Sequence, residues 1–176
     1  MPPHALRLAR LLKWVATLLL AVLPLVVIQA GWRGAQAPGW LVTAFPGLPQ
    51  GTVLSGTKST LVLAVGALAL GPMLAALWQM RGLFAHYAKG EVLTPASARR
   101  ILAIGLWLAV LAAIQILLPS VQRLVLTWDN PPGSREVSIA LTSEMLWLAL
   151  AAGLLVTIGW AMHEAARVAE ENRGFV

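Results

Sequence analysis

The sequence predicts an all-α integral membrane protein: a four-transmembrane-helix bundle with a cytoplasmic interfacial segment and a C-terminal helical extension. Three observations carry this prediction. Hydrophobic residues make up 59% of the 176-residue chain and charged residues only 11%, whereas about a quarter of the residues in soluble domains are charged. The mean hydropathy is +0.77. Uncharged stretches recur at the length of about 20 residues that a spanning helix needs. We therefore interpret residues 1–176 as a single four-span membrane domain.

The four spans are expected at residues 11–30, 59–80, 97–119 and 138–163. Basic residues bound the first three spans, and only Glu144 interrupts the fourth. The basic start of the first span also fits a signal peptide, but its apolar stretch is longer than such peptides have, which favours an uncleaved span. Pro24 and Gly71–Pro72 predict kinks, because proline removes a hydrogen bond from the helix ladder.

The uncharged stretch from Gly34 to Thr57 is not expected to span the membrane. It contains three prolines and five glycines, and each backbone amide outside the helix ladder costs several kcal/mol in lipid. Its apolar part, Trp40 to Phe45, is expected to lie along the interface in an external loop.

The distribution of lysine and arginine predicts that both termini are cytoplasmic. Nine of the 13 basic residues then lie inside: Arg7, Arg10, Lys13, Arg81, Lys89, Arg99, Arg100, Arg167 and Arg173. Four lie outside: Arg33, Lys58, Arg123 and Arg135. The net charge of +6 thus reflects orientation and attraction to anionic lipid headgroups, and no nucleic-acid surface is indicated.

Stripes of small residues predict where the spans approach one another. The stripes are Ala67, Gly71 and Ala75; Gly105, Ala109 and Ala113; and Ala149, Gly153, Thr157, Ala161 and Ala165. Trp107 and Trp147 lie deeper in their spans than the other tryptophans and are expected between helices. These helix faces are also the expected contacts with a protein partner or a second copy, alongside the lipid bilayer.

The inner loop is expected to begin with an interfacial segment from Arg81 to Lys89, followed by a turn at Gly90. Thr94 and Pro95 then predict a helix start, as N-cap and first residue. We expect residues 81–94 to pack against the helical tail 164–173. Together they would offer a surface for a cytoplasmic partner through Tyr87, Lys89, Glu91, Glu164, Arg167 and Glu171.

These two segments also resemble a known family. The residues that carry the resemblance are Leu83–Phe84, Tyr87, Lys89 to Thr94, Arg100–Ile101, Gly105 and the ending from Glu164 to Val176. They are similar to the signature of the bacterial membrane group catalogued as domain of unknown function 2975. The chain departs from that pattern at Leu93, usually an aromatic residue, and in its Pro- and Gly-rich first outer loop. The resemblance implies a four-span inner-membrane protein, often encoded beside a helix-turn-helix regulator, and implies no catalytic residues.

Residues with site chemistry are scarce in this chain. It has no cysteine, and Arg167 occupies the second ligand position of a zinc-type helix that begins at His163. No phosphate-binding glycine loop occurs. We therefore expect no enzyme, no cofactor and no metal. Glu144 and Gln115 are the candidate intramembrane functional residues. Glu144 is expected close to the outer headgroups with Arg123 and Lys58 as its partners, as a structural anchor in the first place and as a proton- or ligand-linked site in the alternative.

The predicted function is therefore that of an accessory, regulatory or assembly component that contacts other membrane proteins. Small-residue faces and interfacial aromatic residues are plentiful in the sequence, which favours this reading. The alternative is a small transporter, or a ligand or proton sensor that uses Glu144.

Overall fold

The computed structural model describes residues 3–49, 51–131, 135 and 141–173, with side chains up to Val168 in the last helix. Four of its helical stretches are long and apolar enough to cross a membrane. The described elements are α1 (Pro3–Gln36), α2 (Trp40–Ala44), α3 (Gly56–Ala67), α4 (Leu70–Tyr87), α5 (Pro95–Thr127) and α6 (Ser143–Arg173). The all-α fold with four apolar spans is thereby confirmed.

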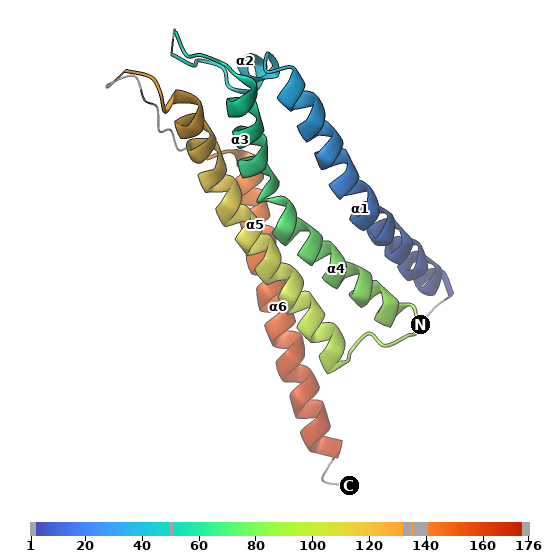
Figure 1. The fold of residues 1–176 in the computed structure, drawn as a ribbon. Coiled ribbons are helices and arrows are strands. Elements are labelled where there is room, and N and C mark those ends of the chain that lie inside the picture. The colour runs from blue at the N-terminus through green and yellow to red at the C-terminus, as the bar shows by residue number, and fades with distance from the viewer. Residues whose placement is uncertain (1–2, 50, 132–134, 136–140, 174–176) are drawn as a thin grey trace.

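The second span is divided into α3 and α4 by a break at Leu68 and Ala69. Pro72 explains the break, because it has no N–H to donate to the Leu68 carbonyl and its ring crowds the preceding turn. Figure 1 shows the change of direction between the two helices. The kink predicted at Gly71–Pro72 is thus found one turn earlier, whereas α1 continues through Pro24.

The third span begins where the capping signal predicts. The Thr94 hydroxyl accepts a hydrogen bond from the Ser97 N–H at 3.2 Å, and Pro95 is the first residue of α5. Gly90 makes the preceding turn with a φ of +86°, a conformation that favours glycine. Most of the segment from Arg81 to Lys89 is helical, since α4 continues to Tyr87, and its interfacial position stays a prediction.

α5 and α6 cross with their backbones in close contact. A Cβ atom at Gly159 would lie 2.5 Å from the Leu102 nitrogen, and one at Gly105 would lie 2.6 Å from the Val156 nitrogen. The buried small residues recur every seven positions, as in shallow left-handed helix packing: Ala98, Gly105 and Ala112 on α5, and Ala152 and Gly159 on α6.

The predicted small-residue stripes are therefore mostly wrong as packing faces within the chain. Of their members, Gly105 is buried at a helix crossing, but Ala109, Ala113 and Gly153 are exposed. A Cβ atom at Gly71 or Gly153 would meet nothing within 4 Å. Trp107 and Trp147 are also exposed, by 40% and 72%. Because α6 begins at Ser143, Trp147 lies near a span end, at the depth typical of interfacial tryptophans.

α2 covers one end of the bundle. Leu41 of α2 is buried against Val62 of α3 and Leu126 of α5. The Trp40 indole donates to the Ser59 hydroxyl at 2.8 Å, and that hydroxyl donates to the Gly34 carbonyl at 2.6 Å. The stretch 34–57 does not form a span, as predicted, and its apolar part is the short helix α2.

The spans pack side by side in chain order, from α1 through α3 and α4 to α5 and α6 (Figure 1). α1 begins, α4 ends, α5 begins and α6 ends at the same end of the molecule. We call this the arginine-rich end, because it holds the basic residues that the orientation analysis groups inside, from Arg7 to Arg173. The other end holds α2 and Lys58.

Candidate functional site

A partly open cavity of about 660 Å³ lies beside the break between α3 and α4. Its walls come from α1, α2, α3, α4 and α5, and most of its lining is apolar. The polar side chains on its wall are few: Trp40, Thr60, Gln115 and Gln122. A volume of this size with few polar groups is typical of small-molecule sites.

Gln115, one of the two predicted intramembrane polar residues, lines this cavity and is half-buried. Within the described residues its amide makes no hydrogen bond. Gln122 lies on the same wall and donates from its amide nitrogen to the Val62 carbonyl at 3.1 Å. The sequence analysis missed Gln122, although its spacing of seven residues from Gln115 places both on one face of α5.

Glu144, the other predicted polar residue, lies away from the cavity lining. It is exposed in the first turn of α6, because the helix begins at Ser143 and not near residue 138. Residues 138–140 of the predicted fourth span lie outside the described residues. The predicted pairing of Glu144 with Lys58 is wrong, since Lys58 pairs with Asp129. Arg123 donates to the Pro46 carbonyl at 3.1 Å.

Lys58 connects α3 to the end of α5. Its ammonium group donates to the Leu126 carbonyl at 2.8 Å and pairs with the Asp129 carboxylate. The hydrogen bond from Lys58 is the main reason that the pKa of Asp129 is lowered from its usual value. Nearby, the Asn130 amide donates to the Thr52 hydroxyl at 3.0 Å. These contacts fix helix ends, and we assign them a structural role.

The residues of the predicted cytoplasmic surface divide into two groups. Tyr87 packs against the buried cluster of Leu83, Ile101 and Ile104. Lys89 and Glu91 are exposed beside it. The Glu91 carboxylate lies 2.7 Å from His86 Nδ1, and the hydrogen bond with His86 is the main cause of its lowered pKa.

The second group lies on the tail. Glu164 pairs with Arg167 along α6, while the side chain of Glu171 lies outside the described residues. Figure 1 shows the last turns of α6 projecting beyond α5, which lies between α4 and α6. Met162, just before the tail, packs against the cluster of Leu83, Ile101 and Ile104, and the packing of residues 81–94 against the tail itself stays a prediction.

A polar pocket between α4 and α5 was also missed by sequence reasoning. It has a volume of about 360 Å³ and is lined by Gln79, His86, Ala96, Arg99, Arg100 and Ala103. The adjacent Arg99 and Arg100 at a helix start are the sequence signal for this pocket, but in the sequence they also fit the positive charge expected on the cytoplasmic side of a span.

Metal chemistry finds no support in the described part of the chain, where no group of three His, Cys, Asp or Glu residues could hold an ion. Comparison with family models, curated proteins and solved structures found no match to this chain. The resemblance to the group named domain of unknown function 2975 therefore stays a prediction.

Proposed function

We propose that this chain is a non-enzymatic, multi-pass accessory protein of a bacterial inner membrane, which binds a helix of another membrane protein through α6. The observation that carries the proposal is the placement of the small residues of α6. The stripe of Ala149, Gly153, Thr157, Ala161 and Ala165 is exposed, although such stripes are the usual close-contact faces of membrane helices.

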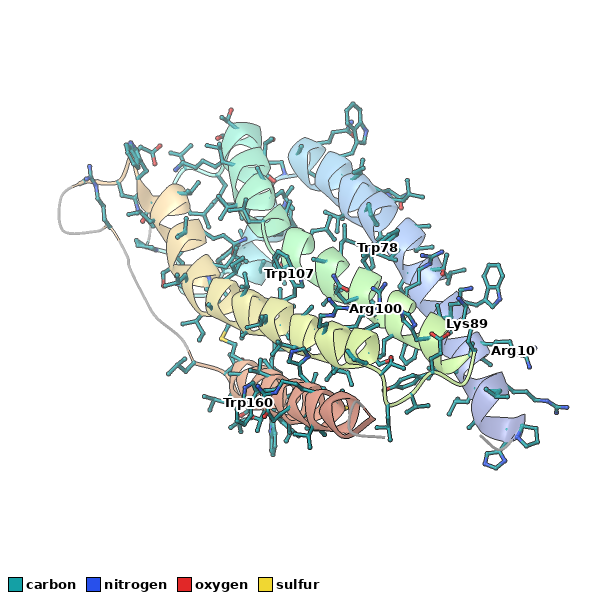
Figure 2. All side chains as sticks on the ribbon, turned by 90° about the horizontal axis from the view of Figure 1, so that it is seen from below. Arg10, Trp78, Lys89, Arg100, Trp107 and Trp160 are labelled. Atoms are coloured by element: carbon teal, nitrogen blue, oxygen red, sulfur yellow. The ribbon has the colours of Figure 1, made fainter. Side chains whose placement is uncertain are left out.

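The packing of α6 supports this proposal. Within the chain α6 packs chiefly on α5, through the face that carries Ala152 and Gly159. Figure 2 shows α6 at the edge of the molecule, with Trp160 on it. The Thr157 hydroxyl donates to the Gly153 carbonyl of the same helix at 3.0 Å, so its polar group is satisfied within α6. The small side chains of the stripe would let the backbone of a second helix approach closely.

The distribution of charge supports an orientation with both termini in the cytoplasm. The end where α1 begins and α6 finishes carries most of the basic residues, as cytoplasmic ends of membrane proteins do. We propose this orientation, together with membership of the bacterial family that the inner loop resembles, as the setting in which the α6 face acts.

A second candidate function is the binding of a small lipophilic ligand in the cavity beside the helix break. The half-buried Gln115 amide on an apolar wall favours it. Glu144 does not line that cavity, so this alternative now depends on Gln115 and Gln122.

The accessory function is tested by purifying a tagged chain in mild detergent with two variants. Gly153→Leu fills the stripe, and a Cβ atom there meets no neighbour within 4 Å. Ala151→Leu is the matched control, because Ala151 is exposed on the same helix outside the stripe. We expect a second membrane protein to co-purify in stoichiometric amount with the wild type and with Ala151→Leu, and to be lost with Gly153→Leu.

The proposal would be contradicted if no stoichiometric protein co-purified with the wild type, or if both variants recovered it equally. Recovery of a second copy alone would make α6 a self-association face.

A further inference from the structure

The pocket between α4 and α5 at the arginine-rich end holds an unusual arginine. The Arg100 guanidinium is half-buried between the two helices, and its Nη1 donates to the Gln79 side-chain oxygen at 3.1 Å. Figure 2 shows Arg100 between α4 and α5. Gln79 is neutral, so it satisfies one of the five N–H donors of the guanidinium and leaves the charge uncompensated.

Gly82 creates the space that this guanidinium occupies. A Cβ atom at Gly82 would lie 2.1 Å from Arg100 Nη1 and 2.4 Å from its Cζ. The space is therefore specific to glycine, because any side chain at position 82 would displace the Arg100 guanidinium from between the helices.

The pocket carries excess positive charge. Arg99 lies on its wall beside Arg100, and within the described residues no carboxylate lies within 4.0 Å of either guanidinium. The nearby Glu91 carboxylate is engaged with His86, which also lines the pocket. Ala96, another lining residue, belongs to the first turn of α5, where the helix dipole adds partial positive charge.

An exposed tryptophan beside the pocket indicates that the pocket lies at the depth of the lipid headgroups. Trp78 of α4 is 57% exposed and directly precedes Gln79, and exposed tryptophans concentrate at the membrane interface. The Arg81 guanidinium lies 5.2 Å from the centre of the Trp78 ring, and its Nε donates to the Thr17 hydroxyl at 3.0 Å. Arg81 is thus held by its own neighbours, which leaves Arg99 and Arg100 to receive an anion.

We propose that this pocket binds the phosphate group of an anionic phospholipid. Arginine forks match phosphate oxygens and form charge-assisted hydrogen bonds with them. Basic pockets between spanning helices are known to take such headgroups. The lipid would supply the counter-charge that the protein lacks there and would hold α4 and α5 together at this end.

The test measures the affinity of the purified full chain, in a nonionic detergent, for phosphatidylglycerol and for phosphatidylcholine by native mass spectrometry. The wild type is expected to prefer phosphatidylglycerol. The key variant is Gly82→Ala, which displaces the Arg100 side chain and leaves the net charge unchanged. Its control is Gly71→Ala, since a Cβ atom at Gly71 meets nothing within 4 Å.

Gly82→Ala should weaken phosphatidylglycerol binding about tenfold, the order expected when charge-assisted hydrogen bonds are lost, and Gly71→Ala should not. A second pair separates the pocket from general charge. Arg99→Gln with Arg100→Gln should abolish the lipid preference. Arg10→Gln with Lys89→Gln removes two exposed charges from the same end (Figure 2) and should preserve it.

Three results would overturn the proposal. Equal affinity of Gly82→Ala and Gly71→Ala for phosphatidylglycerol would show that the position of Arg100 between the helices does not contribute to binding. Equal loss in both double variants would indicate a diffuse surface charge. Displacement of the lipid by inorganic phosphate at low concentration would assign the pocket to a free anion in place of a lipid.

Discussion

Lys58 shows how a single basic residue at a span end can be structural. Its side chain is only 12% exposed, and it reaches both the Leu126 carbonyl near the end of α5 and the Asp129 carboxylate. A cation at the carboxyl end of a helix is favourable because the last carbonyls carry partial negative charge. The sequence marked Lys58 as a span boundary, but its partner could not be predicted, because Asp129 lies 71 positions away.

The pairing makes stability depend on pH in a defined direction. The pKa of Asp129 is lowered in the folded chain, so its contribution is present above the unfolded value of about 3.9 and is lost as the pH falls through the folded value. Asp129→Asn should therefore lower the melting temperature at pH 7. The gap to the wild type should close as the pH falls below about 4. Thermal unfolding in nonionic detergent measures this, and a gap that stays constant with pH would contradict the role of the charge.

The positions of the helices could be predicted from the sequence far better than their faces. Charged residues mark where a span must end, and Thr94–Pro95 marks a helix start through local hydrogen bonding. The contact faces depend on which helix lies opposite, and a spacing of four residues in the sequence does not identify it. The buried set has a spacing of seven, from Ala98 to Gly105 and from Ala152 to Gly159.

The α5–α6 crossing yields a prediction with a close control. Gly159→Ala places a methyl group against the backbone of Leu102, which cannot move aside as a side-chain tip can. Overpacking of this kind costs about 1–3 kcal/mol, so the melting temperature in detergent should fall. Gly153→Ala on the same helix should be neutral, because its Cβ atom meets no neighbour within 4 Å. Equal melting temperatures for the two variants would rule out the close crossing.

At the scale of the whole molecule, alternate crossing of four spans accounts for the two ends. The chain crosses the membrane once between the start of α1 and the start of α2, so these two points lie at opposite ends. The same alternation places the nine basic residues of the inner segments together at one end. The structure places the described helix ends in the same groups. The candidate sites were less accessible to prediction: Gln115 was identified as an isolated polar residue in a span, but its cavity depends on the break at Leu68 and on the packing of α1 beside it.

The grouping of helix ends leads to a prediction about the whole topology. The chain has no cysteine, so a single introduced cysteine reports the side of the membrane on which it lies. Arg7→Cys and Lys89→Cys should behave alike, because both exposed positions lie at the arginine-rich end, and Gln36→Cys should behave oppositely. With both termini in the cytoplasm, an impermeant maleimide applied to intact cells should label Gln36→Cys and spare the other two until the membrane is opened.

Labelling of Arg7→Cys and Lys89→Cys with protection of Gln36→Cys would show that the orientation is the opposite one, with the same fold. Different labelling of Arg7→Cys and Lys89→Cys would place these two positions on opposite sides of the membrane. That result would contradict the arrangement of the helices itself, which puts both positions at the same end of the molecule.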